Sequence, residues 1–207
     1  MTRVRTPLLL VALLMALPLA LTGCGPQRAT RPADPGSQGG VPQIGGPFQL
    51  VDQDDRPTDQ RLLQGKWTAV FFGYTYCPDV CPTTLALLGR VQAMLGPKAA
   101  DWQVVFISVD PERDTPAQLK TYLSSPVFPR GANGLTGSPA QVAAAAKAYK
   151  VFYQKEGSGA AYTVDHTSAI YLMDPQGKFD RVLAEGLTPD DMSHQILEAM
   201  SGDANAG

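Results

Sequence analysis

The stretch WTAVFFGYTYCPDVCP, residues 67–82, decides the fold of this chain. Its first half, residues 67–74, is a β-rich apolar run and is predicted to form a central strand. Cys77 and Cys81 follow in a loop, and we expect a helix to begin at Pro82 with Cys81 at its N-cap. A helix N-terminus favours thiolate over thiol, and thiolate is the form that binds soft metals and exchanges disulfides.

The rest of the domain alternates predicted strands with predicted helices. Further strands are expected at about residues 48–51, 104–109, 151–154, 161–164, 169–173 and 178–184, and further helices after the capping residues Thr115, Ser138 and Thr188. This order predicts an α/β, thioredoxin-like fold, which is a central mixed β-sheet flanked by helices, with a hairpin insertion. Sites in open α/β sheets gather at the carboxyl ends of strands, and the loop of Cys77 lies at such an end.

The first residues are predicted to be a targeting signal. Residues 1–23 have a positive start and a short apolar stretch, residues 8–21, which is too short for a confident membrane span. The tetrapeptide LTGC, residues 21–24, resembles a bacterial lipobox, in which Cys24 becomes lipid-modified. The alternative is a plain secretory signal with a chance cysteine. We therefore expect an exported, membrane-anchored lipoprotein that faces the periplasm or extracytoplasmic space.

Composition sets the remaining boundaries. Residues 24–46 are rich in Gly, Pro, Gln and Ser and are predicted to be a flexible tether from the lipidated cysteine. Residues 47–202 suit one compact domain, and residues 203–207 are predicted to be a disordered tail. The formal net charge of −2 comes with no basic stripe, which argues against a nucleic-acid partner.

Cys77 and Cys81 are better explained by chemistry than by structural stapling, because a disulfide across so short a loop constrains little of the unfolded chain. The chain has two histidines. His194 follows Met192 by two positions and is predicted to point away from the apolar face of its helix, into solvent. His166 lies between two apolar strands, where it could be structural or a metal ligand.

Two thiolates and one imidazole make a coherent donor set for copper. Thiolates favour Cu(I), imidazole tolerates several transition metals, and the same set could take Cu(II). Structural zinc usually takes four ligands, so a zinc module falls one short. Asp165 could order the imidazole, approach the metal or serve the turn, and the sequence leaves these roles open.

Four segments, taken together and in order, resemble the Sco/SenC family of copper proteins over roughly residues 46–200. They are FFGYTYCPDVCP (71–82), FISVDPERDTP (106–116), AYKVFY (148–153) and VDHTSAIYLMD (164–174). The resemblance implies a thioredoxin-like fold and copper, as Cu(I), Cu(II) or both, bound by Cys77, Cys81 and His166. It also implies a role in building the dinuclear copper centre in the copper-bearing subunit of cytochrome c oxidase.

The resemblance leaves several points open. Such a role needs a periplasmic copper donor and a thiol reductant as partners, besides the membrane that holds the lipid anchor. Many members carry an acidic residue near the start of the helix, where this chain has Thr83 and Thr84. The loop of residues 110–114 fits the family, and the sequence assigns it no chemical role.

Two functional hypotheses remain. A metal carrier would hold copper on the three side chains and pass it on by ligand exchange, without turning over a small substrate. A thiol-disulfide oxidoreductase, or a peroxide-reducing thiol protein, would use Cys77 and Cys81 as attacking and resolving thiols. Whether the protein is an enzyme stays undecided. A docking surface for an acceptor around Tyr74 and Tyr76 is a further option.

Overall fold

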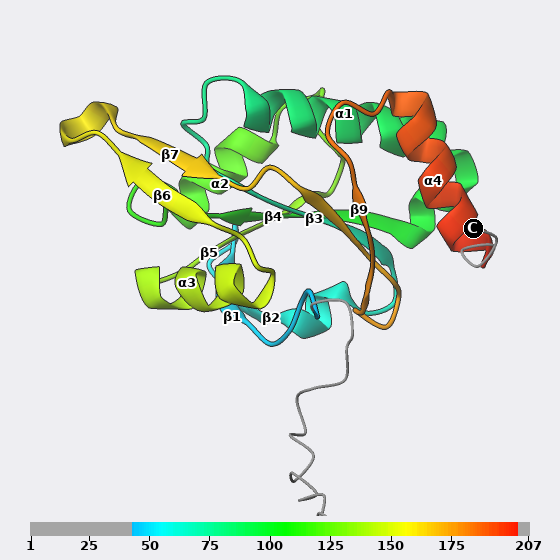
Figure 1. Ribbon diagram of the computed structural model, residues 1–207, viewed down its shortest axis with the longest axis horizontal. Helices are drawn as coiled ribbons and strands as arrows, with labels where there is room; N and C mark the ends of the chain where they lie inside the picture. Colours follow the sequence, from blue (N-terminus) through cyan, green and yellow to red (C-terminus); the bar gives the residue numbers. More distant parts are fainter. Residues whose placement is uncertain (1–42, 203–207) are drawn as a thin grey trace, which may run out of the picture. The chain divides into compact units, whose positions relative to one another are not determined.

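The computed structural model describes residues 43–202, in which seven strands form one sheet in the order β2-β1-β5-β4-β3-β8-β9 (Figure 1). These strands are β1 (Gln49–Asp52), β2 (Pro57–Asp59), β3 (Trp67–Gly73), β4 (Trp102–Ser108), β5 (Asn133–Thr136), β8 (Ile170–Met173) and β9 (Phe179–Leu183). The helices are α1 (Val80–Met94), α2 (Pro116–Leu123), α3 (Pro139–Ala148) and α4 (Pro189–Ser201), with short 3-10 helices η1 (Gln60–Leu63), η2 (Gly96–Asp101) and η3 (Gly159–Ala161). Strands β6 (Tyr153–Glu156) and β7 (Thr163–His166) form a separate hairpin.

The sheet is mixed, and β3 lies at its centre. Strand β3 pairs in parallel with β4, whereas β8 runs antiparallel to it on the other side. In Figure 1, α1, α2 and α4 lie on one side of the sheet and α3 lies on the other. Both faces of β3 and β4 are therefore covered, which explains why these strands are continuous apolar runs. The predicted α/β, thioredoxin-like architecture is confirmed.

The two faces of β3 are filled by neighbouring aromatic side chains. Phe71 packs on Phe106 with ring centroids 5.9 Å apart, and the next residue, Phe72, packs on Tyr149 at 5.3 Å. All four side chains are fully buried. Successive residues of a strand point to opposite faces, so Phe71 joins β3 to β4 on one face, and Phe72 packs against Tyr149, the C-cap of α3, on the other.

Helix α1 begins earlier than the sequence predicts. Its N-cap is Asp79 and its first residue is Val80, so Cys81 lies inside the first turn rather than at the N-cap. The prediction relied on the preference of proline for the first helical position. Pro82 is accepted two positions later because the first N–H groups of a helix have no intrahelical acceptor to lose. The turn is closed by the Thr83 N–H, which donates to the Asp79 carbonyl oxygen at 3.1 Å.

The other helix starts lie where the sequence places them. Thr115, Ser138 and Thr188 are N-caps, and each side-chain oxygen accepts a hydrogen bond from a backbone N–H in the first turn. Only Ser138 forms the full capping box, with Gln141. The Gln118 side chain turns instead toward the cysteine loop, where it donates to Thr75 Oγ1 at 3.3 Å.

Strands β2 and β5 were not predicted from the sequence. Strand β5 is short and contains a glycine, so it shows neither alternation nor β-branched enrichment. Close packing of α2 on β5 explains the glycine, because a Cβ at Gly134 would lie 2.6 Å from Leu123 Cδ1 of α2. The segment forms a strand because β4 and β1 flank it and pair with its backbone N–H and C=O groups.

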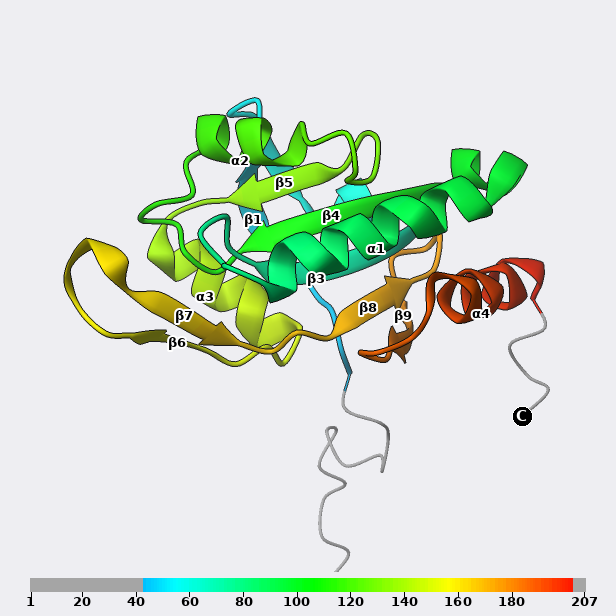
Figure 2. The same ribbon diagram turned by 90° about the horizontal axis from the view of Figure 1, so that it is seen from above.

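The β6–β7 hairpin projects beyond the sheet in both ribbon views (Figures 1 and 2). His166 ends β7 and pairs with Tyr153 at the inner end of the hairpin. The hairpin was expected at about residues 151–154 and 161–164, and each strand is shifted by two residues toward the C-terminus. Because of this shift, His166 is the last residue of the hairpin strand β7 and does not follow it.

The predicted signal segment, Cys24, most of the predicted tether and the predicted tail lie outside the described residues. Those assignments stay predictions. The described part starts just before Ile44, which packs against the core, and Gly45, whose N–H donates to the Ala148 carbonyl oxygen at 3.0 Å. Within residues 43–202, every helix is too short or too polar to cross a lipid bilayer.

Candidate metal centre

The cysteine loop leaves the carboxyl end of β3 at Gly73. A Cβ on Gly73 would lie 2.7 Å from Cys81 Sγ and 2.8 Å from the Phe106 ring. Real Cβ atoms do not approach other atoms so closely, so only glycine lets the Cys81 thiol lie against the end of the strand. The glycine thus explains how a thiol in the first turn of α1 reaches the sheet.

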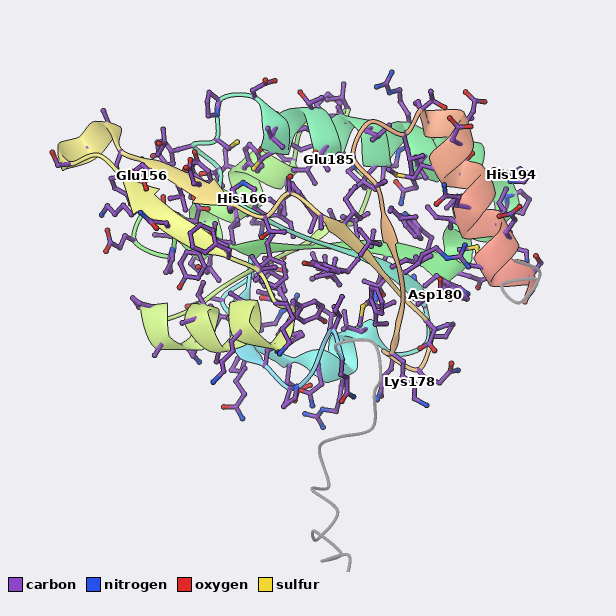
Figure 3. The ribbon with its side chains drawn as sticks, viewed as in Figure 1. Glu156, His166, Lys178, Asp180, Glu185 and His194 are labelled. Carbon is purple, nitrogen blue, oxygen red and sulfur yellow. The ribbon has the colours of Figure 1, made fainter. Side chains whose placement is uncertain are left out.

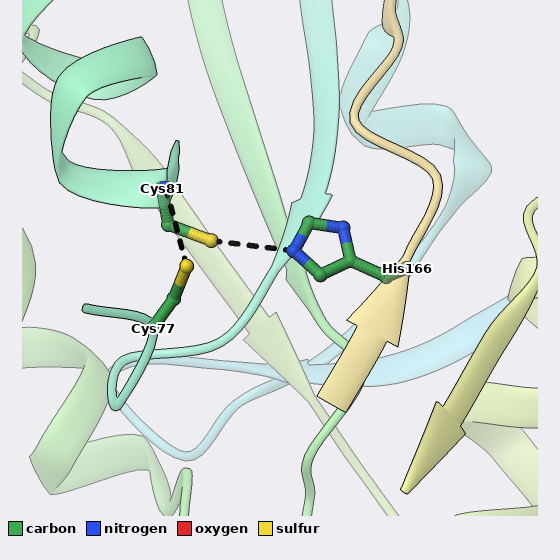
Figure 4. A group of neighbouring side chains, drawn as sticks. All are labelled: Cys77, Cys81 and His166. Atoms are coloured by element: carbon green, nitrogen blue, oxygen red, sulfur yellow. Dashed lines mark hydrogen bonds between the residues drawn. The ribbon is translucent and has the colours of Figure 1, made fainter. Parts of the chain in front are cut away.

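The two thiols lie side by side and are free (Figure 4). The Cys77 N–H donates to the Tyr74 carbonyl oxygen at 3.2 Å, which makes the loop turn back. The Cys81 N–H then donates to Cys77 Sγ at 3.4 Å. Cys77 is half-buried, whereas Cys81 is fully buried. The pair therefore has one inner and one outer thiol.

His166 completes the group from the end of the hairpin. Its Nε2 atom lies 3.5 Å from Cys81 Sγ, and its Nδ1 atom lies 3.0 Å from the Thr167 carbonyl oxygen. A carbonyl oxygen can only accept, so this contact places the ring proton on Nδ1. The Nε2 lone pair then faces the thiols and is available to a thiol proton or a metal.

Cys77, Cys81 and His166 each offer one ligand atom, and these atoms all lie within 4.8 Å of one another. A first-row ion holds thiolate sulfur at about 2.3 Å and imidazole nitrogen at about 2.0 Å, so two ligand atoms on one ion are at most about 4.6 Å apart. The three side chains are thus close to a metal-binding arrangement. Folding brings together the three residues that the sequence analysis singled out, from two segments far apart in the chain.

Burial opposes the expected effect of the helix N-terminus on Cys81. Removal from water raises the pKa of the Cys81 thiol well above its ordinary value, and a negative charge on Cys77 would raise it further. From the sequence, the helix N-terminus is expected to favour thiolate at this pair. Burial of Cys81 therefore acts against the effect of the helix N-terminus and favours the protonated thiol. A bound cation would replace the proton.

Aromatic rings hold the imidazole in place. Tyr74 meets the His166 ring edge-on, with centroids 5.9 Å apart, and Phe71 does so at 6.3 Å. Tyr74 is only 3% exposed, so it does not belong to a docking surface as the sequence analysis had considered. Tyr76 is 55% exposed and is the member of that pair which a partner could touch.

Two other sequence candidates lie away from the group. Asp165 is exposed and its neighbours in the strand, Val164 and His166, point to the opposite face. The imidazole is ordered by the Thr167 carbonyl rather than by Asp165. His194 is exposed on α4, paired with Glu198 at 3.2 Å, and Figure 3 places it at the far end of the molecule from His166.

The loop between β4 and α2 was noted in the sequence as fitting the family, but its contacts with the cysteine loop were not predicted. Asp114 is fully buried, and its carboxylate accepts hydrogen bonds from Thr75 and Ser108. Ser108 ends β4, which lies beside β3, so the loops after both strands meet at one edge of the sheet. Acidic residues directly after a buried strand at that edge were the available signal.

A model of the SCO1/SenC family matches residues 36–201. The chain belongs to this family. The mitochondrial SCO1 homolog 1 of Arabidopsis thaliana is 37% identical over 165 residues, which is 79% of this chain and 49% of the relative. This chain thus spans about half the length of that relative.

Solved structures agree with the family assignment. Bradyrhizobium japonicum ScoI, solved with copper bound, is 45% identical, with a TM-score of 0.69 over 75% of this chain and 98% of that one. BsSco, described as having a disulfide switch and as a member of the Sco family of cytochrome c oxidase assembly proteins, is 26% identical, with a TM-score of 0.60 over 80% of this chain and 96% of that one.

Proposed function

We propose that this protein is a copper carrier that binds one copper ion through Cys77, Cys81 and His166. The observation that carries the proposal is that the three ligand atoms already lie within 4.8 Å of one another. The Nδ1 proton of His166 is committed to a backbone carbonyl, so Nε2 needs no tautomer change before it binds.

The donor set favours copper over the alternatives. Two thiolates and an imidazole suit Cu(I) in a three-coordinate site and also accept Cu(II). Within residues 43–202, the metal-ligating cluster holds these three residues and no fourth, whereas structural zinc usually takes four ligands. A three-coordinate copper leaves room for a ligand from an acceptor protein.

The burial of the ligands suits transfer as well as binding. Cys81 is the buried ligand, while Cys77 and His166 are half-buried and line an open cavity with Pro78 and Val80. An acceptor can therefore approach the copper from one side and exchange with Cys77 or His166 first. Cys81 then becomes the last ligand to release the ion.

We further propose that the acceptor is the copper-bearing subunit of cytochrome c oxidase. Support comes from BsSco, which shares the fold and is described as belonging to oxidase assembly proteins. Delivery needs a periplasmic copper donor and a reductant that keeps both thiols reduced. The test is to mix the copper-loaded protein with the metal-free copper domain of the subunit and to follow the growth of its dinuclear copper absorption. No transfer from the wild type would contradict this role.

Export and lipid anchoring at Cys24 belong to the same proposal. A carrier for an extracytoplasmic copper centre must work outside the cytoplasm, and the lipobox-like tetrapeptide supplies the anchor. We expect Cys24→Ser to abolish fatty-acid labelling and to release the protein from the membrane fraction of expressing cells. Unchanged labelling in that variant would contradict the assignment.

The binding experiment is an anaerobic copper titration of the reduced protein. We expect one copper per chain in the wild type and an affinity more than about 100-fold lower after each of the changes Cys77→Ala, Cys81→Ala and His166→Ala, because loss of a direct ligand costs more than loss of an outer partner. His194→Ala is the matched control, since that exposed histidine lies outside the cluster. Equal stoichiometry and affinity in all of these proteins would overturn the site.

A second candidate function is thiol-disulfide exchange on the acceptor. It is favoured by the closeness of the two free thiols, since Cys77 Sγ accepts from the Cys81 N–H. In this reaction one thiolate attacks an acceptor disulfide, the other resolves the mixed disulfide, and the acceptor gains two electrons and two protons while Cys77 and Cys81 become a disulfide. Fast reduction of the oxidised acceptor that is unaffected by His166→Ala would favour this function over copper delivery.

A further inference from the structure

The loop between β4 and α2, residues 110–114, lies between the two parts of the candidate metal site. None of its residues belongs to the ligand cluster. It nevertheless contacts both the cysteine loop and the hairpin that carries His166.

On the cysteine side, the loop holds Thr75 and Tyr76, which directly precede Cys77. One carboxylate oxygen of Asp114 accepts from the Thr75 N–H at 3.0 Å, and the other accepts from Thr75 Oγ1 at 2.7 Å. The guanidinium carbon of Arg113 lies 4.7 Å from the centroid of the Tyr76 ring, within the range of a cation–π contact. The cysteine loop is thus fixed from one side.

On the hairpin side, the same arginine holds the residue that precedes β7. Its guanidinium carbon lies 3.5 Å from the centroid of the Tyr162 ring, and its Nη1 donates to the Tyr162 carbonyl oxygen at 3.0 Å. The Tyr162 hydroxyl donates to Asp110 Oδ1 at 2.6 Å, and the Arg113 Nε donates to the other oxygen of Asp110. Arg113 therefore contacts tyrosine rings from both parts of the site, Tyr76 of the cysteine loop and Tyr162 next to the hairpin strand β7.

These contacts are well suited to fixing the hairpin. An isolated two-stranded hairpin is marginally stable in water, so its position depends on tertiary contacts. The outer part of β6 is exposed, and an ion pair from Lys155 to Glu112 at 2.8 Å adds another link to the loop. Arg113 itself is 15% exposed and its partner Asp110 is 4% exposed, so water screens this ion pair little.

We propose that Arg113 is a positioning residue that sets the distance between His166 and the two thiols by clamping the hairpin against the cysteine loop. The Nη2 atom of Arg113 is buried without a hydrogen-bond partner among the described residues. The side chain is held by its contacts with the Tyr76 and Tyr162 rings and by the hydrogen bonds that its Nε and Nη1 donate. Lysine lacks the planar fork, so it is a poor substitute at this place. The inference rests on the proposed copper function.

The test is a double-mutant cycle on copper release. Copper dissociation into an excess of a Cu(I) chelator is measured for the wild type, Arg113→Met, His166→Ala and the double variant. Arg181→Met is the control, since Arg181 also forms a partly buried ion pair, with Asp180 on β9, and Figure 3 shows Asp180 away from His166. Arg113→Lys, which keeps the charge, serves as the milder variant if Arg113→Met folds poorly.

We expect Arg113→Met to speed release about tenfold, in line with the loss of an outer partner of a metal ligand. In the His166→Ala background the same change should alter the rate less than about twofold, because the clamp acts through the histidine. We expect Arg113→Lys to fall between wild type and Arg113→Met, and Arg181→Met to match the wild type. An Arg113→Met rate within about twofold of the wild type, or an equal effect in both backgrounds, would overturn the proposal.

Hydrogen exchange of the metal-free proteins separates this proposal from the copper function. We expect Arg113→Met to speed amide exchange in residues 153–156 and 163–166 without changing exchange in β3 and β4. Failure of the wild type to bind copper would refute the proposed function, and the exchange result would still decide whether Arg113 holds the hairpin. Unchanged exchange in the hairpin would refute the clamp.

Discussion

At the scale of single residues, the site depends on a glycine and on a backbone carbonyl as well as on the three proposed ligand side chains. Gly73 leaves the space that Cys81 Sγ and the Phe106 ring fill. The orientation of His166 depends on a backbone carbonyl at Thr167. Neither a glycine nor a backbone carbonyl indicates metal binding when the sequence is read alone.

Gly73→Ala tests the close approach of the thiol to the strand. The added Cβ would lie 2.7 Å from Cys81 Sγ, and both neighbours are fully buried, so the helix or the ring must move. We expect a loss of about 1–3 kcal/mol in the free energy of unfolding, measured by urea denaturation, together with weaker copper binding. An unchanged unfolding midpoint together with wild-type copper affinity would contradict the close approach of Cys81 Sγ to Gly73.

The two thiols should also differ in reactivity. Cys81 is fully buried, and burial raises the pKa of its thiol. At a given pH, a smaller fraction of Cys81 is therefore thiolate than in an exposed cysteine. We expect iodoacetamide to label Cys77 faster than Cys81 in the reduced, metal-free protein at pH 8, as measured by peptide mass spectrometry. The rates should become similar in urea, where burial is lost. Equal rates in the folded protein would contradict this description.

At the scale of elements, the sequence was informative where one side chain decides a boundary. The capping residues predicted the starts of three helices, and long apolar runs predicted β3 and β4. The start of α1 was wrong because a proline can occupy any position of the first turn. Strand β5 was missed because only its neighbours in the sheet make it a strand.

Ser138→Ala tests the independence of α3 from the metal site. The change removes the acceptor of the Gln141 N–H and disrupts the capping box. We expect a loss of about 0.5–2 kcal/mol in the free energy of unfolding, by chemical denaturation. Copper affinity should stay at the wild-type value, because α3 covers the face of the sheet opposite α1. A matching loss of copper affinity would mean that the two faces are coupled.

At the scale of the whole molecule, the site closes only when a distant hairpin returns to the cysteine loop. Spacing indicated the thiol pair, and the family resemblance implied His166 as its partner. The contact between them depends on the fold and on the loop of residues 110–114, to which the sequence assigned no role. The role of Arg113 could not be predicted, since its partners Tyr76 and Tyr162 are distant in sequence.

Copper binding should therefore stabilise the folded chain as a whole. A ligand that binds only the folded state adds about 2.7 kcal/mol when its free concentration is 100 times the dissociation constant. We expect copper to raise the melting temperature of the wild type, by calorimetry under reducing conditions, and to raise that of His166→Ala much less. An equal shift in both proteins would show that the hairpin histidine does not take part.

The most direct measurement of the central claim is copper X-ray absorption spectroscopy of the reduced, copper-loaded protein. We predict two sulfur neighbours at about 2.3 Å and one imidazole nitrogen at about 2.0 Å. The nitrogen signal should disappear in His166→Ala and persist in His194→Ala. A shell without sulfur, or an imidazole signal unchanged in His166→Ala, would contradict the assignment of Cys77, Cys81 and His166 as the copper ligands.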